Sequence, residues 1–255
     1  MSGSKFGKRG RTENDAGIRK VAPTYGRMRI QTRNAKTQQS MTVDGHAERL
    51  TCCALNVDPS VETYLPQPLT VDLIDGCIHH TTDAVKEARR KHAGRPGPWF
   101  YTPDHLVHWS GQSSRTALEV KDESWPGDND YERKLKHATE ILNYFGYECR
   151  KVVIPSHPQV ALRRNLALLS QAMVRNLPPI PVALQQAELV TDSEQVWTLS
   201  SACQALRTSI QQAPWLVLRG YIGMDVVGQH IKADTPVYLA GGDLEHLCLL
   251  RRMMQ

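Results

Sequence analysis

Apolar positions between residues 47 and 57 recur at helical spacing, and this pattern predicts the first helix of the chain. Asp58-Pro59-Ser60 predicts the end of that helix, because proline disfavours helical backbone in the residue before it. Residues 61–74 are rich in β-branched side chains and alternate between apolar and polar. They predict one or two strands, interrupted near Pro66-Gln67-Pro68.

The middle of the chain predicts a hairpin that carries polar groups on one face. Residues 100–109 and 116–121 have strand character and flank the polar connection 110–114. Before them, the charged stretch 79–98 is expected to be an insertion between strands, with a short helix at 82–92. If Trp109 pairs near residue 114 or 115, antiparallel counting places residue 104 opposite residue 119 or its neighbour.

A helix and a further strand follow the hairpin. Residues 131–144 place Leu135, Ala138, Ile141 and Leu142 on one stripe, which predicts a helix, and residues 149–154 predict a strand. Strands with helices packed against them indicate an α/β or α+β core.

The last hundred residues predict more helix than strand. Residues 160–176 have helical apolar spacing, and Thr191 and Glu194 form a potential capping box for a helix running from 192 towards 212.

Two stretches near the end then predict a pair of strands. They are residues 215–222 and 235–239, and helices followed by two strands are typical of a winged-helix-like α+β module. The expected organisation is therefore an N-terminal arm at 1–40, a first domain at 41–156 and a second domain at 157–255.

The charge of the expected N-terminal arm, residues 1–40, suggests that it binds a polyanion. The net charge is only +5, yet ten lysines and arginines precede Met41 and only Glu13 and Asp15 oppose them. Such an arm is expected to contact nucleic-acid phosphates, the alternative being a merely solvated tail.

Composition also narrows the expected location of the chain. No apolar run approaches the length of a membrane span, and the basic, polar start is not a secretory signal. The six cysteines include no C-x-x-C pair, so neither a disulfide framework nor a zinc knuckle is indicated. We expect a reducing bacterial cytoplasm.

The chemistry-bearing residues are concentrated on the predicted hairpin. Asp104 lies at its first strand, and Glu119 and Lys121 stand two apart on the second, so the latter two share a face. Two carboxylates can bind a hard cation, and an ammonium can position water and offset phosphate charge. The alternative is an exposed salt bridge. A second acid-x-lysine, at Glu132 and Lys134, is predicted on a helix, where residues two apart diverge.

A family resemblance rests on several motifs in order. Glu48 begins ERLTCCALNVDPSV, a Gln67-Pro68 pair follows, and then come YTPD at residues 101–104 and EVK at residues 119–121. This series resembles the TnsA-type transposon endonucleases over about residues 40–155. The segment LRGYIGMD, at residues 218–225, resembles the winged-helix region of that family more loosely.

The resemblance implies a restriction-endonuclease-like PD-(D/E)XK fold with Glu48, Asp104, Glu119 and Lys121 as its active set. The three acids would bind Mg²⁺, with Mn²⁺ also accepted, the Val120 carbonyl would add a ligand, and Lys121 would position the water. Family members cut the 5′ strands at transposon ends, in double-stranded DNA. They act with a TnsB-like DDE transposase and a TnsC-like AAA+ ATPase, and some act with CRISPR-associated targeting complexes.

Several alternatives stay open. Asp44 is a second candidate ligand near Glu48, because the residues before the helical acid depart from the family pattern. Histidines at 79, 80, 105 and 108 offer a transition-metal site with Glu119, although surface and strand histidines are the preferred interpretation. For the whole chain, the alternatives are a stand-alone nuclease of the restriction or junction-resolving kind and a non-catalytic adaptor for DNA or an ATPase.

Overall fold

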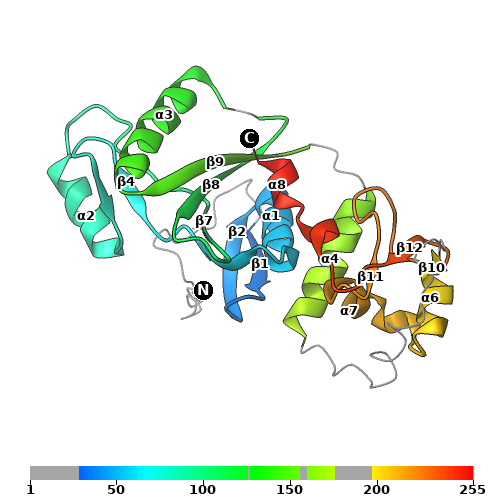
Figure 1. The fold of residues 1–255 in the computed structure, drawn as a ribbon. Coiled ribbons are helices and arrows are strands. Elements are labelled where there is room, and N and C mark those ends of the chain that lie inside the picture. Colours follow the sequence, from blue (N-terminus) through cyan, green and yellow to red (C-terminus); the bar gives the residue numbers. More distant parts are fainter. Residues whose placement is uncertain (1–28, 126, 156–159, 176–196, 255) are drawn as a thin grey trace, which may run out of the picture.

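The computed structural model describes residues 29–125, 127–155, 160–175 and 197–254 (Figure 1). It begins with an antiparallel hairpin of β1 (Arg29–Asn34) and β2 (Gln39–Asp44). Asn34 ties this hairpin to the rest of the fold, because its side-chain amide donates to the Tyr64 carbonyl at 2.7 Å. Ordered structure therefore starts before residue 41, and the expected end of the arm at residue 40 falls inside a hairpin.

Helix α1 (His46–Val57) confirms the predicted first helix and its proline-linked end. Its last eight residues, 50–57, are all buried, so the helix is enclosed on every side rather than on one stripe. The Asp58 backbone N–H caps the helix by donating to the Ala54 carbonyl.

The main sheet has four strands in the order β3 (Val61–Pro66), β7 (His105–Trp109), β8 (Arg115–Asp122) and β9 (Tyr147–Ile154). Neighbouring strands are antiparallel except β8 and β9, which are parallel. A parallel pair requires a crossover connection, which α3 (Asn129–Tyr144) provides, as the helical stripe predicted.

Helices α1 and α3 pack on opposite faces of the main sheet. Leu118 and Val120 belong to the same buried cluster as α1, whereas Ala117 packs with Ala138 and Leu142 of α3. This alternation along β8 follows from the two-residue period of a strand. The molecule is thus mixed α/β with several sheets, which is compatible with the expected α+β class.

A smaller three-stranded sheet stands beside the first, in the order β5 (Cys77–His79), β4 (Thr70–Asp72) and β6 (Phe100–Tyr101). Helix α2 (Thr82–Lys91) follows β5 and confirms the short helix predicted in the charged stretch. The predicted strand at 100–109 is divided between the two sheets, because β6 pairs with β4 and β7 pairs with β3.

Part of the C-terminal prediction is wrong. Helix α4 (Val160–Val174) is as expected, but the helix predicted to run to residue 212 is not continuous. Its predicted capping box and first residues lie outside the described ranges. A short strand, β10 (Trp197–Thr198), comes before α6 (Leu199–Ala205), and a 3-10 turn, η1 (Ile210–Gln212), follows it. Thr198 and Ser201 form a capping box at the start of α6.

The strand predicted at residues 215–222 is also wrong. Its first half belongs to helix α7 (Ala213–Leu218), a turn follows, and only its last residue lies in a strand, β11 (Ile222–Gly223). Pro214 stands in the first turn of α7, where its fixed φ favours a helix start. A continuous apolar run cannot distinguish a buried helix from a buried strand. The other predicted strand is confirmed as β12 (Pro236–Leu239), which lies between β10 and β11 in a three-stranded sheet.

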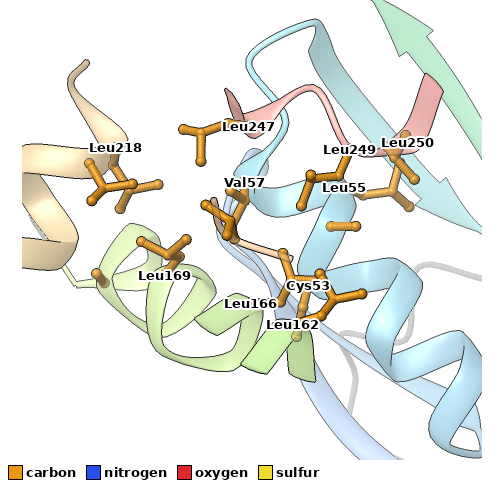
Figure 2. Packing of buried hydrophobic residues seen from close by; sticks show 14 of the residues in the cluster. Cys53, Leu55, Val57, Leu162, Leu166, Leu169, Leu218, Leu247, Leu249 and Leu250 are labelled. Carbon is orange, nitrogen blue, oxygen red and sulfur yellow. The ribbon is translucent and has the colours of Figure 1, made fainter. Parts of the chain in front are cut away.

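One buried apolar cluster joins the two halves of the chain. Figure 2 shows α1 side chains facing α4, with residues of α7 and of the C-terminal segment around them: Cys53, Leu55, Val57, Leu162, Leu166, Leu169, Leu218, Leu247, Leu249 and Leu250. The expected division at residues 156 and 157 is therefore crossed by a continuous core.

The C-terminal segment completes that core. It contains the 3-10 turn η2 (Glu245–Leu247) and α8 (Leu250–Met253). Met254 then pairs with Val152 of β9, so the end of the chain lies against the main sheet (Figure 1). Among the described residues, no helix has the length and apolar character needed to cross a membrane.

Candidate functional site

The hairpin of β7 and β8 sets the geometry of the candidate site. His105 pairs with Leu118, so continuing the register by one residue places Asp104 opposite Glu119, as the count predicted. The Asp104 backbone N–H donates to the Leu118 carbonyl at 3.0 Å. Its carboxylate Oδ2 accepts from the Val120 N–H at 2.8 Å. Asp104 is therefore held by backbone contacts where β7 begins.

The Glu119 carboxylate has three side-chain donors around it. The Lys121 ammonium lies 2.8 Å from Glu119 Oε1, which confirms that these two residues share a face of β8. The Tyr131 hydroxyl donates to the same oxygen at 2.6 Å, and the Tyr101 hydroxyl donates to Oε2 at 2.7 Å. A carboxylate offers about four acceptor positions, so three donors leave about one.

Aromatic rings enclose the ammonium of Lys121. Its Nζ lies 4.2 Å from the centroid of the Tyr131 ring and 5.0 Å from that of Trp125. Rings at this range attract a cation through their π faces. The sequence pattern indicated no role for Tyr101 or Tyr131, the two residues whose hydroxyls donate to Glu119. Tyr101 stood inside the YTPD motif, but the contact of Tyr131 depends on where α3 crosses the sheet.

Glu48 approaches the site from the first turn of α1. Its Oε2 accepts from the Asp44 backbone N–H at 3.0 Å. Asp44 thus reaches Glu48 through its main chain, and its candidacy as a second ligand stays a prediction. The negative charge of Glu48 also acts on Asp104, so the residues from α1, β7 and β8 share one electrostatic neighbourhood.

The clearest electrostatic consequence appears at Asp104. Burial raises the pKa of its carboxyl well above the usual range, and the charges of Glu119 and Glu48 raise it further. The Val120 N–H and the Lys121 ammonium oppose this rise only in part. A site in which two further carboxylates act on Asp104 and only one ammonium opposes them has an excess of negative charge, and a divalent cation would compensate it.

The three carboxylates do not form a closed set of ligands. Within the described ranges, the trios of metal-ligating side chains whose donor atoms lie within 4.8 Å of one another all contain Asp72. Glu48, Asp104 and Glu119 are not among them. The Val120 N–H points at Asp104, and its carbonyl points to the same side of the strand, as in any β residue. The roles of these residues in metal binding stay predictions.

The structure places His105 and His108 on strand β7, in agreement with the preferred interpretation of surface and strand histidines. His105 is fully buried, its Nε2 lies 3.8 Å from the Cys52 sulfur, and burial lowers its pKa to about 4. It is a neutral core residue at physiological pH. His79 is different, because it gathers with Asp72 and Cys77 at a separate place.

The helical acid-x-lysine does not imitate the site. Glu132, on α3, pairs with Lys151 of β9 at 3.0 Å. All six cysteines are free thiols, and Cys52 and Cys53 are buried.

The arrangement combines an acid fixed at a strand start, an acid paired with lysine, and a third acid within electrostatic range. Such a set can bind a hard cation through oxygen and hold an ammonium beside it. No family model matches this sequence, and no curated protein is similar to it at a significant level.

Proposed function

We propose that this chain is a divalent-cation-dependent DNA endonuclease of the TnsA type. The observation that supports it most is the 2.8 Å pair of Lys121 and Glu119 on the strand opposite Asp104, in a buried and negatively charged setting. The proposal includes a PD-(D/E)XK core around the main sheet. It also includes a winged-helix-like domain formed by the C-terminal elements.

In this proposal the carboxylates of Glu48, Asp104 and Glu119, with the Val120 carbonyl, hold Mg²⁺ or Mn²⁺. A bound cation of this kind polarises a phosphate and lowers the pKa of a water molecule. The hard oxygen donors suit such an ion, and the raised pKa of Asp104 fits a site that a cation would relieve of like-charge repulsion.

Lys121 has the second part in the proposed chemistry. Its ammonium is held between Glu119 and two aromatic rings, so it can orient the attacking water and offset the charge that develops on the phosphate. The hydroxyls of Tyr101 and Tyr131 position Glu119 from two sides. They are positioning residues, because they act through the carboxylate.

The wider role follows from the family resemblance alone. The substrate would be double-stranded DNA at transposon ends, cut on the 5′ strands, while a TnsB-like DDE transposase cuts and joins the 3′ strands. A TnsC-like AAA+ regulator would contact the endonuclease, and in some systems a CRISPR-associated targeting complex would act with them. The basic residues before Met41 would add phosphate contacts.

The test is strand-resolved cleavage of transposon-end DNA with Mg²⁺, in the presence and absence of the partner proteins. We expect a partner-dependent 5′-strand cut that falls at least about 100-fold in Asp104→Ala and in Lys121→Ala. Asp83 and Lys86 form a matched exposed pair on α2, 2.8 Å apart, so Asp83→Ala and Lys86→Ala should retain full activity.

The other outcomes separate the alternatives. Cutting without any partner would favour a stand-alone nuclease. A cut that survives Asp104→Ala, or no cut under any condition, would contradict the proposed site, and the latter would favour the non-catalytic adaptor. Far-ultraviolet circular dichroism of each variant shows whether lost activity reflects lost folding.

A further inference from the structure

The β4–β5 hairpin carries a second group of chemistry-bearing side chains, away from the nuclease candidates. Asp72 ends β4, and Cys77 and His79 are the first and last residues of β5. Donor atoms of these three side chains all lie within 4.8 Å of one another. Asp72 is fully buried, while Cys77 and His79 are half-buried, so solvent reaches one side of the group.

The two distances from His79 to the other donor atoms match those of a tetrahedral metal site. His79 Nε2 lies 3.8 Å from the Cys77 sulfur and 3.4 Å from Asp72 Oδ2. Ligands at ordinary zinc bond lengths in tetrahedral geometry stand ~3.6 Å apart for sulfur and nitrogen, and ~3.3 Å apart for nitrogen and oxygen. The third distance, between the Cys77 sulfur and an Asp72 carboxylate oxygen, is at most 4.8 Å, so an ion could bind all three residues after a local adjustment of their side chains.

We propose that Asp72, Cys77 and His79 bind a thiophilic divalent cation, most simply Zn²⁺, with water at the fourth position. Sulfur and imidazole donors favour zinc and related transition metals over Mg²⁺, which selects oxygen. The site is therefore chemically distinct from the carboxylates proposed to hold Mg²⁺. The observations that support it do not depend on the nuclease proposal.

Neighbouring groups hold the Asp72 carboxylate in place for such an ion. Its Oδ1 accepts from the backbone N–H groups of Ile74 and Asp75, each at 3.0 Å. Its Oδ2 lies 2.8 Å from Nε2 of the fully buried His92, which follows α2. That distance is a hydrogen bond and is too short for two ligands of one ion, so His92 orients the ligand rather than joining it.

Metal binding at this group would be coupled to loss of the Cys77 thiol proton. Burial and the neighbouring carboxylates of Asp72 and Asp75 raise the pKa of the Cys77 thiol, so without a metal it stays protonated at neutral pH. Lys91 pairs with Asp75 at 2.6 Å and so offsets the charge of that carboxylate, which leaves Asp72 as the anionic ligand of the group. Metal binding would displace the thiol proton, leaving a thiolate and a carboxylate to balance the two charges of the ion.

The local fold would gain from such a bond. Strands β4 and β5 have three residues each, and α2 buries only Val85 and Ala88 among its ten residues. Short strands and a short helix with so little apolar burial are weak elements by themselves. A metal bound to the β4–β5 hairpin would link these elements, because its ligand Asp72 also contacts His92, the C-cap residue of α2.

The experiment is a metal titration of the full-length chain, after removal of bound metal with a chelator and in a thiol-free reductant. Co²⁺ is the first probe, because a cobalt–thiolate bond gives a charge-transfer absorption band that oxygen ligands do not. We expect the band to saturate at one equivalent and to be displaced by Zn²⁺. In Cys77→Ser the band should vanish, and in both Cys77→Ser and His79→Ala the Zn²⁺ affinity should fall at least about 100-fold.

Three matched variants serve as controls. Cys149→Ser removes another half-buried thiol, His80→Ala removes the exposed neighbouring imidazole, and Asp104→Ala alters the nuclease candidates. All three should keep the cobalt band. A band that survives Cys77→Ser, or no band at one equivalent of Co²⁺, would overturn the proposal.

A second measurement needs no variant and so does not depend on variant folding. Zn²⁺ should slow alkylation of Cys77 at least tenfold while leaving the rate at Cys149 unchanged, as peptide mass spectrometry would resolve. Equal alkylation rates at Cys77 with and without Zn²⁺ would leave Asp72, His79 and His92 as a hydrogen-bonded cluster without a metal.

Discussion

At the scale of single residues, the folded chain destabilises the charged form of the Asp104 carboxyl. Asp104 is half-buried and lies within electrostatic range of Glu119 and Glu48, while its carboxylate receives one backbone hydrogen bond. A carboxyl whose pKa is higher in the folded chain than in the unfolded chain holds its proton better when folded. The free energy of unfolding therefore falls as the pH rises from about 4, the ordinary pKa of aspartate, towards the raised folded value.

This predicts that Asp104→Asn stabilises the metal-free protein. Asparagine keeps an oxygen that can accept from the Val120 N–H, but it carries no charge. At pH 8 we expect the variant to be more stable by about 1 kcal/mol, and the difference should shrink near pH 4. Urea unfolding at both pH values in a chelator is the measurement. Asp83→Asn, at an exposed position, is the control, and a wild type as stable as Asp104→Asn at pH 8 would contradict the expected repulsion.

The residue scale also shows what sequence reasoning could reach. Counting across a short hairpin placed Asp104 opposite Glu119 because the register of a hairpin is fixed by local pairing. The hydroxyl contacts of Tyr101 and Tyr131 depend on β6 and α3, which are brought to β8 by tertiary packing. The group of Asp72, Cys77 and His79 was not predicted, because it contains no C-x-x-C pair. Its aspartate lies on β4 and the other two residues lie on β5, so only the pairing of these strands brings the three together.

At the scale of elements, predictions succeeded where periodicity was distinct. The helical stripe of α3 matched the structure, because one face of that helix is buried and the other is exposed. The two-residue alternation along β8 matched as well, although both faces of this strand are covered: Leu118 and Val120 pack with α1 and Ala117 packs with α3. The run at 215–222 failed because α7 is buried on most sides, and an element without a polar face loses its period. Helix α1 was found in spite of similar burial, since Asp58-Pro59 marked its end.

The contact of α1 with α4 gives the prediction at this scale. Leu166 lies on α4, is fully buried and packs in the cluster shared with α1 (Figure 2), whereas Leu168 on the same helix is 39% exposed. Leu166→Ala should lower the free energy of unfolding by 2–5 kcal/mol, as is typical for a buried leucine, and Leu168→Ala by less than about 1 kcal/mol.

Calorimetry of the same two variants tests how the halves of the chain are coupled. Because one cluster spans both halves, Leu166→Ala should shift a single unfolding transition to lower temperature. Two transitions, of which only one moves, would instead support independent domains on either side of residue 156.

At the scale of the whole molecule, the end of the chain closes the core that α1 begins. Leu249 and Leu250 are buried against α1, and the Leu250 N–H lies 3.4 Å from the carboxylate of Asp58 at the end of that helix. Met254 then pairs with β9. The last described residues therefore belong to the same buried core as α1 and lie against the first sheet.

Deletion of residues 249–255 is therefore expected to destabilise the whole molecule, and not the C-terminal elements alone. The deletion removes two buried leucines and the pairing with Val152, so we expect a loss of at least about 4 kcal/mol. Hydrogen exchange should then accelerate in α1 and β9 as well as near α7. Leu250→Ala should reproduce about half of the loss, while Arg251→Ala, exposed on the same helix, should change little. Exchange that accelerates only after residue 160 would show that the first sheet holds together without the end of the chain.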